Sequence, residues 1–342
     1  MKGKRFVVVG ENIHCTRVYK VGGSFVKPGP DGKQAVVYGG KGEPKYLPVP
    51  DVFLQGADWQ AGKVKHCGVA VWQGLYGDKA CQASAVDYLQ FLARRQTDAG
   101  AAFLDVNVDE FSTDVAERIR AIRWVAGVVQ QASKLPLSID SSNPDILRAG
   151  LAACDAAHGR PMVNSVSLER QDSIAVAAEF HAVVIASAAG EKDLPSTTEE
   201  RLANLDRLMP KLQAVGLKGD GVYVDPLVFP VATDSNNAKS FLDAVSAVRA
   251  KYGPEIHISG GLSNVSFGMP NRKLINQVFT WLAVEAGADG GIVDPLQINQ
   301  KMLDTVDTAT EPFRLAKALL TGEDMFGVEY IAAHREGRLG AE

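Results

Sequence analysis

Short apolar runs alternate with helical patterns along most of this chain, and this alternation restricts the fold more than any other feature. The candidate strands are Phe6–Val9, Ala102–Val106, Leu135–Ile139, Met162–Val166, Ala182–Ser187, Val222–Val224, Ile256–Ser259 and Gly291–Val293. The helical patterns are Ser84–Ala99, Val115–Lys134, Pro144–Ala157, Ser173–Phe180, Thr198–Val215, Ala238–Tyr252 and Leu274–Ala286. Strands that alternate with helices in this way predict parallel βαβ units.

The number of these units favours one architecture over its main alternative. Eight units in 342 residues are typical of a single (β/α)8 TIM barrel of the α/β class. A doubly wound sheet commonly has fewer strands and a phosphate-binding fingerprint after its first strand. The first strand here runs into GENIH, which is not that fingerprint. We therefore predict one barrel domain over residues 1–342.

A long insertion, residues 15–78, interrupts the pattern after the first strand. Its stretch FVKPGPDGKQAVVYGG is typical of a hairpin around Pro30-Asp31-Gly32. A loop that follows a barrel strand emerges at the C-terminal face, so we predict that the insertion packs over the barrel mouth as a lid or a docking surface. The alternative is a disordered surface loop. The tail, about residues 323–342, contains the basic helix-like piece IAAHREGRL.

Composition excludes several classes of function. The formal net charge is −4 and no basic block occurs, so we expect no nucleic-acid partner. No apolar run approaches the length of a membrane span, and we interpret the short N-terminal run as the first strand rather than as a signal peptide. The four cysteines show no CxxC spacing. We therefore expect a reduced, cytoplasmic protein.

Polar side chains stand at the carboxyl ends of the candidate strands. They are Glu11, Asn12, Asp105, Asn107, Asp140, Asn164, Asp225 and Asp294. Because a buried carboxylate is costly without partners, several of them at one barrel mouth require a ligand, a metal or each other. Simpler roles are open for each. Asp140 is a candidate N-cap of the next helix, Asp225 and Asp294 precede prolines and suit turns, and Asn164 suits a hydrogen bond to the backbone.

The stretch His257–Arg272, HISGGLSNVSFGMPNR, has the composition of an active-site loop. A short strand breaks into Gly260-Gly261, where the backbone can take a positive φ or approach a ligand closely. Ser263 and Asn264 follow at once, and Pro270 precedes the next helical pattern. A strand, a polar glycine-rich loop and a helix form a βα unit, and such loops build the active site of a barrel.

The residue types at the strand ends limit the kind of ligand. There is no GxSxG motif and no ordinary zinc spacing. The doublets His14-Cys15 and His66-Cys67 are the only hint of a metal, and we predict none. Carboxylates with asparagines suit a neutral, planar heterocycle, because an adjacent ring NH and amino group present two parallel donors to one carboxylate.

Six segments, in this order, closely resemble one known family. They are GENI, FLDVNVD, SIDSSNPDILRAGL, NSVS, YVDPLVFP and GLSNVSFGMPNR. The resemblance is to the pterin-binding methyltransferases, which move a methyl group between N5 of tetrahydrofolate and a corrinoid protein. This family is related to the folate module of cobalamin-dependent methionine synthase. The match covers about the whole chain except the insertion and the tail. The family usually has GERIN where this chain has GENIH, so His14 departs from the pattern.

The resemblance implies roles for individual residues. Asp140, Asn164 and Asp225 look like the pterin-binding trio, and Asn264 resembles the catalytic asparagine near N5. The other residues implied at the pterin site are Glu11, Asp105, Asn107, Ser263 and Arg272. The substrate implied is tetrahydrofolate or 5-methyltetrahydrofolate, and the partner implied is a corrinoid protein that carries cobalamin. We further expect a homodimer, and we leave the direction of transfer open.

Two other functions are weighed against this one. Dihydropteroate synthase, with a related pterin-binding barrel, expects a lysine in the loop after strand seven, where this chain has Gly260-Gly261-Leu262-Ser263-Asn264. A non-catalytic folate-binding module would have no need of a group at N5, the position implied for Asn264.

Overall fold

The computed structural model describes residues 5–40 and 42–340, and it contains an eight-stranded sheet in the order β12-β11-β10-β9-β8-β7-β1-β13. The strands are β1 (Val7–His14), β7 (Phe103–Asn107), β8 (Leu137–Asp140), β9 (Met162–Val166), β10 (Val183–Ser187), β11 (Val222–Asp225), β12 (His257–Ile258) and β13 (Gly290–Val293). The registered pairs that involve these strands are parallel. Gly261 and Ile292 form a parallel bridge between the two ends of the strand order. The sheet is therefore a nearly closed barrel, and the predicted TIM-barrel fold is confirmed.

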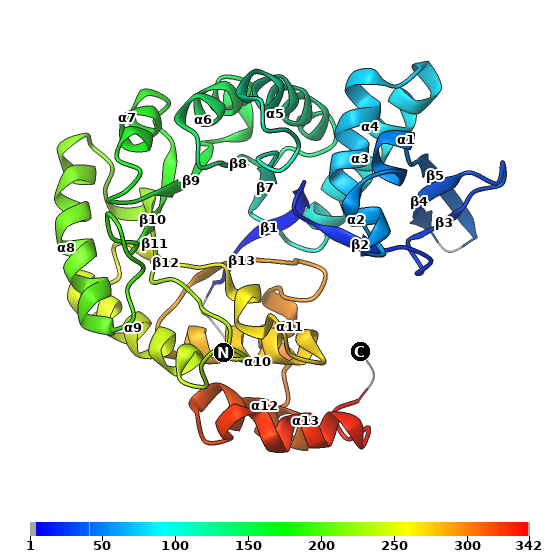
Figure 1. Cartoon of the computed structure of the whole chain (residues 1–342). Helices are drawn as coiled ribbons and strands as arrows, with labels where there is room; N and C mark the ends of the chain where they lie inside the picture. The colour runs from blue at the N-terminus through cyan, green and yellow to red at the C-terminus, as the bar shows by residue number, and fades with distance from the viewer. Residues whose placement is uncertain (1–4, 41, 341–342) are drawn as a thin grey trace. The chain divides into compact units, whose positions relative to one another are not determined.

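The chain divides into two compact units. Figure 1 colours the chain by residue number, so the segments of each unit can be found in it. The first contains residues 1–10, 99–102 and 162–342, and the second contains residues 11–98 and 103–161. The predicted single domain over residues 1–342 stays a prediction, and its residues 1–4, 41 and 341–342 lie outside the described part of the chain.

The first unit carries the amino end of β1 and strands β9 to β13. Its helices are α7 (Asp172–Glu179), α8 (Thr198–Ala214), α9 (Asn237–Tyr252), α10 (Arg272–Ala286), α11 (Gln300–Thr305), α12 (Glu311–Thr321) and α13 (Val328–Arg335). Helices α9 and α10 pack through Phe241 and Phe279, whose ring centroids lie 5.3 Å apart and whose side chains are fully buried. The predicted helix in the tail is α13.

The second unit carries the carboxyl end of β1, strands β7 and β8, and the insertion. Its main helices are α4 (Lys79–Asp98), α5 (Val115–Gln130) and α6 (Pro144–Leu151). The α6 helix is shorter than the predicted Pro144–Ala157, because Asp155 starts a separate 3-10 turn that ends at Gly159 with a φ of 101°. Strand β1 is longer than predicted, since it continues through the polar residues Glu11 and Asn12 to His14.

The insertion folds into small elements of its own within the second unit. They are β2 (Val18–Lys20), β3 (Val26–Pro28), β4 (Gln34–Gly40), β5 (Glu43–Pro48), α1 (Asp51–Leu54), α2 (Ala57–Gln60), β6 (Lys63–Lys65) and α3 (His66–Tyr76). The antiparallel β3-β4 pair turns through Pro30-Asp31-Gly32, so the predicted hairpin is confirmed. Val36 and Leu47 give the β3-β4-β5 sheet a buried face.

Candidate functional site

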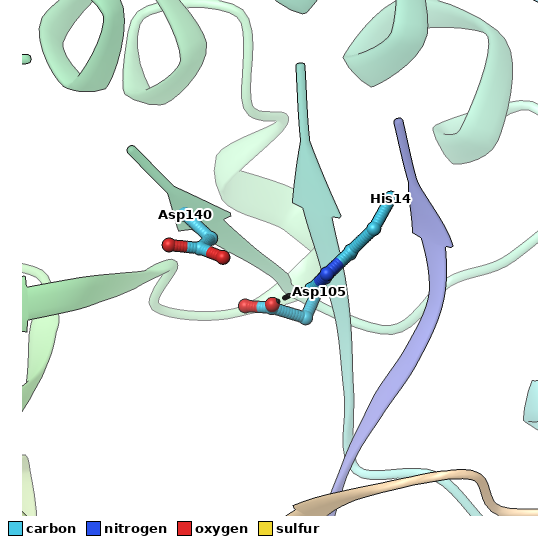
Figure 2. A group of neighbouring side chains, drawn as sticks. All are labelled: His14, Asp105 and Asp140. Atoms are coloured by element: carbon cyan, nitrogen blue, oxygen red, sulfur yellow. Dashed lines mark hydrogen bonds and ion pairs between the residues drawn. The ribbon is translucent and has the colours of Figure 1, made fainter. Parts of the chain in front are cut away.

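Three polar side chains of the second unit meet at the carboxyl ends of β1, β7 and β8. Figure 2 shows His14, Asp105 and Asp140, which offer nitrogen and oxygen atoms within 4.8 Å of one another. Nε2 of His14 lies 2.6 Å from Oδ2 of Asp105, and the Asp105 side chain is fully buried. Residues 105 and 107 point to one side of β7 because side chains alternate along a strand.

The charges of these three groups affect one another. Burial opposes a charged imidazole, but the hydrogen bond to Asp105 and the charges of Asp105 and Asp140 outweigh it and raise the pKa of His14. Burial and the charge of Asp105 raise the pKa of Asp140, against the opposing effects of His14 and Asn107. At an effective dielectric constant of about 20, two carboxylates this close repel by on the order of 3 kcal/mol. A proton on His14 therefore offsets part of the repulsion between the carboxylates of Asp105 and Asp140.

The contacts of Asn107 and Asn143 show which hydrogen bonds Asp140 makes and which it does not. Asn107 Nδ2 donates a 2.9 Å hydrogen bond to Oδ2 of Asp140. The N-cap of α6 is Asn143, whose side chain accepts from the backbone of Asp145 and Ile146. The alternative that Asp140 caps this helix is therefore wrong. In the described part of the chain, Oδ1 of Asp140 accepts no hydrogen bond, so it can receive a donor from a ligand.

Two further acidic residues of this unit are held by arginines. Glu11, which is buried, lies 2.5 Å from the guanidinium of Arg17 in the insertion. Asp109 accepts a hydrogen bond of 2.6 Å from the Ser141 hydroxyl and lies 3.9 Å from Arg118. Sequence reasoning missed Asp109, whose role depends on contacts with residues that lie far along the chain.

Asp225 ends β11 in the first unit with one oxygen engaged. Its Oδ1 accepts a 2.8 Å hydrogen bond from the backbone of Leu227, as the turn interpretation predicts. Burial raises the pKa of Asp225 to about 6, although the Leu227 N–H and the charge of Arg201 oppose the shift. Oδ2 accepts no hydrogen bond from the residues the structure describes. A turn role and a ligand role are therefore compatible at this carboxylate.

Arg201, another residue that sequence reasoning missed, shapes the loop after Asp225. Its side chain is 1% exposed. Nε donates to the carbonyl of Pro226 at 2.7 Å, and Nη1 donates to the Ser240 hydroxyl at 2.7 Å. No apolar period or motif distinguishes this arginine from the other charged residues of its helix.

Gly260 and Gly261 are needed for close approach rather than for a positive φ. A Cβ on Gly260 would lie 3.0 Å from Oδ1 of Asp225, and one on Gly261 would lie 2.9 Å from Nδ2 of Asn264. The φ of Gly261 is −72°, so of the two predicted reasons for glycine, a positive φ does not apply there. The two glycines let the side chains of Asp225 and Asn264 flank one stretch of backbone.

The loop after β12 forms a 3-10 helix, Leu262–Ser266, that presents Asn264. The Asn264 side chain is exposed, and its amide makes no hydrogen bond within residues 5–40 and 42–340. Arg272 donates to the Ser263 carbonyl and to the Ser266 hydroxyl, each at 3.0 Å. Arg272 thus fastens the loop, and Ser263 contributes its backbone to this contact.

Asn164 is the third residue of β9 and is half-buried. It is the registered partner of Ile185 in β10. Together the two units account for every predicted site residue. Glu11, Asp105, Asn107 and Asp140 belong to the second unit, and Asn164, Asp225, Ser263, Asn264 and Arg272 belong to the first.

The only set of three metal-type side chains that lie close enough to share an ion, among the described residues, is His14, Asp105 and Asp140. A separation of 2.6 Å between Nε2 of His14 and Oδ2 of Asp105 is that of a charge-assisted hydrogen bond, in which a proton lies between the two atoms.

The other His-Cys doublet, His66-Cys67, has a packing role. His66 stacks on Tyr19 at 3.9 Å, and burial with the charge of Arg17 lowers its pKa to about 3.

Comparisons with known proteins agree on one family and one fold. A sequence model of the family described as "Pterin binding enzyme" matches residues 77–294. The chain is 29% identical over 268 residues to the methylcorrinoid:tetrahydrofolate methyltransferase of Eubacterium limosum, a match that covers 77% of this chain and 92% of that one. It is 30% identical to the methionine synthase of Mycobacterium tuberculosis, over 63% of this chain but only 19% of that one.

Solved structures give the same fold at lower identity. Dihydropteroate synthase of Xanthomonas albilineans with 4-aminobenzoic acid aligns with a TM-score of 0.52 and 20% identity, over 66% of this chain and 86% of that one. The 7,8-dihydropteroate synthase of Vibrio fischeri aligns with a TM-score of 0.52 and 18% identity, over 70% and 86%. These likenesses concern the fold alone. Among the described residues, no helix has the length and apolar character needed to cross a membrane.

Proposed function

The chain belongs to the pterin-binding enzyme family, and from that premise we propose that it transfers a methyl group between a corrinoid protein and N5 of tetrahydrofolate. The observation that carries the proposal is the position of Asp140 and Asp225 and the partners of their carboxylates. Each ends a strand, and neither forms an ion pair with Lys or Arg in the described part of the chain. A carboxylate that is not paired with Lys or Arg keeps an acceptor oxygen for the neutral NH and amino donors of a pterin.

The remaining strand-end residues have supporting roles in this proposal. Asn164 completes the pterin-binding set with Asp140 and Asp225. Asn107 orients Asp140 through its hydrogen bond, and Glu11 and Asp105 of the same unit remain candidates for pterin contacts. Ser263 and Arg272 hold the loop that carries Asn264. The amide of Asn264 is exposed and makes no hydrogen bond with the described residues, which supports its assignment to N5. An amide can either donate or accept as the charge at N5 changes.

The chemistry requires a group that responds to this change of charge. When N5 attacks the methyl carbon, the electron pair of the carbon–cobalt bond stays on the cobalt of the corrinoid, and N5 gains positive character until its proton leaves. A hydrogen bond that strengthens at that point stabilises the transition state more than the bound substrate. The polypeptide otherwise positions the two reactants, which explains why the sequence contains no nucleophile motif.

We take the direction to be from the methylated corrinoid protein to tetrahydrofolate. The E. limosum relative is named for that direction, and it matches most of the chain. In this direction the product is 5-methyltetrahydrofolate, and the partner is a corrinoid protein that other enzymes methylate. A homodimer remains our prediction for the assembly.

One assay tests the proposal against its nearest rival. The purified chain is mixed with tetrahydrofolate and free methylcobalamin, and loss of the methylcobalamin absorbance is followed with formation of 5-methyltetrahydrofolate. The Asn264→Ala variant is the matched control. A parallel reaction contains 4-aminobenzoic acid and a pterin pyrophosphate. Dihydropteroate formation without methyl transfer would contradict the proposal, and tight folate binding without either product would indicate a binding module.

A further inference from the structure

Asp140 has an unusual neighbourhood for a carboxylate that must accept hydrogen bonds from a ligand. Asp105 lies beside it, fully buried, and the charges of these two carboxylates oppose each other. Protonation of Asp140 would relieve this repulsion and would turn one of its acceptor oxygens into a donor. Something must therefore offset the charge of Asp105 if Asp140 is to stay ionised.

His14 is placed to offset that charge. Its Nε2 is 2.6 Å from Oδ2 of Asp105, and it is the last residue of β1. An imidazolium that donates this hydrogen bond makes the His14–Asp105 pair neutral overall. We propose that His14 is a positioning residue that keeps Asp140 ionised, and that it thereby sets the lowest pH at which the protein binds folate.

The other charged groups that face the pair within this unit are already engaged. Arg17 is held by Glu11 at 2.5 Å, and Asp109 is held by Ser141, Ser142 and Arg118. Arg17 slightly opposes a charge on His14, and Asp109 slightly opposes one on Asp140. The contact with His14 brings a group that can carry a positive charge directly against Asp105, at 2.6 Å.

This inference rests on the proposed function, because it assigns Asp140 to the pterin. It goes beyond that function in giving His14 a role that needs a positive charge and that an uncharged hydrogen-bond donor such as asparagine could not perform. An asparagine can donate a hydrogen bond but carries no charge. The pH dependence of folate binding therefore separates the charge of His14 from its hydrogen bond.

The decisive variant is His14→Gln, because the glutamine Nε2 can donate to Asp105 in place of the imidazole Nε2 without carrying a charge. Tetrahydrofolate affinity is measured by calorimetry from pH 5 to pH 8.5 under anaerobic conditions. We expect the pH at half-maximal affinity to rise by about one unit in His14→Gln, which is about a tenfold loss of affinity below that midpoint. The double variant His14→Gln/Asp105→Asn has a neutral pair again, so its midpoint should return toward that of the unmodified protein.

A folate-free measurement keeps this inference separate from the proposed function. Protein labelled with 13C at the aspartate carboxyl carbons is titrated by NMR, and the Asp140 signal is assigned with Asp140→Asn. The Asp140 midpoint should rise in His14→Gln by the same amount as the binding midpoint. If the unmodified protein binds no folate at any pH, the proposed function fails, and the NMR titration still decides the effect of His14 on Asp140.

Three results would overturn the inference. The first is an Asp140 midpoint in His14→Gln equal to that of the unmodified protein, provided that thermal unfolding shows both to be folded. The second is a binding curve for the double variant that stays with that of the single variant. The third is one equivalent of a divalent metal in the purified protein that is lost in His14→Gln, because an ion would then take the place assigned to the proton.

Discussion

Asn107 donates a 2.9 Å hydrogen bond from its side-chain amide to Oδ2 of Asp140, and the two residues are registered partners at the ends of β7 and β8. This hydrogen bond favours the ionised form of Asp140 and leaves Oδ1 open. A carboxylate held at one oxygen and open at the other is oriented before its ligand arrives, which reduces the entropy lost on binding.

The first prediction concerns the two carboxylates. Asp140→Ala and Asp225→Ala should each weaken tetrahydrofolate binding at least tenfold, because a hydrogen bond to a charged group contributes about 1.5–3 kcal/mol. Calorimetry at pH 7.5 measures the effect. Asp294→Ala is the matched control. Asp294 also follows a strand directly, but its two oxygens accept hydrogen bonds from the Leu296 backbone and the Gln297 side chain in the following turn. Unchanged affinity in both test variants would refute the pterin assignment.

The second prediction concerns Asn264. Asn264→Ala should slow single-turnover methyl transfer at saturating folate by tenfold or more and should lower folate affinity by a smaller factor. The reason is that its hydrogen bond strengthens as charge develops at N5, so its loss affects the transition state most. Rapid-mixing absorbance of the corrinoid measures the rate. If saturating folate restores the full rate, another group must act at N5.

The third prediction concerns stability and pH. The pKa of Asp225 is about 6 in the folded protein, above the ordinary value of about 3.9 in the unfolded chain. Between these two pKa values the folded state therefore binds more protons than the unfolded state. The free energy of unfolding falls as Asp225 ionises, and this loss of stability is complete above about pH 6. Asp225→Asn should raise the melting temperature of the folate-free protein at pH 7.5, and this gain should shrink as the pH falls toward 4. A gain that is constant with pH would argue against an ionised Asp225.

The fourth prediction concerns the insertion. Val52, Phe53, Trp72 and Tyr76 of the insertion line a hollow with Phe111, Ser112 and Glu117, a short distance beyond the carboxyl end of β7. Lys65 of the insertion also pairs with Glu110 at 3.0 Å. This position beside a carboxyl-end loop agrees with the predicted docking surface for the corrinoid protein, which stays a prediction.

A double variant tests that surface without removing the insertion. Val52 is 56% exposed and Tyr76 is 41% exposed. Val52→Ala/Tyr76→Ala should reduce methyl transfer from a protein-bound corrinoid at least fivefold, since tyrosine is among the residues that carry most of the binding energy at interfaces. Transfer from free methylcobalamin should be unchanged. Val215→Ala, at an exposed residue just after α8, is the control. Equal losses with both methyl donors would count against docking at this surface.

The order of the barrel elements follows from the sequence alone, because apolar runs and helical periods are local properties of the chain. Most strands and helices begin and end within a few residues of their predicted bounds, and the β3-β4 hairpin follows from its turn residues. The polar strand ends are equally visible, since Asp140 and Asp225 each directly follow an apolar run. Family membership also rests on sequence, because the matching motifs are short and contiguous.

Only the tertiary structure decides which of these polar groups touch. His14 and Asp105 are 91 residues apart, and their contact depends on how β1 and β7 align. Asn143 rather than Asp140 caps α6, although both residue types are suitable N-caps. Asp140 belongs to strand β8, and the helix begins only after Asn143. The buried Arg201 that holds the Pro226 carbonyl has no sequence signal. Periodicity reports which face of an element is buried, but hydrogen-bond partners and charge balance depend on distances between segments that are remote in the chain.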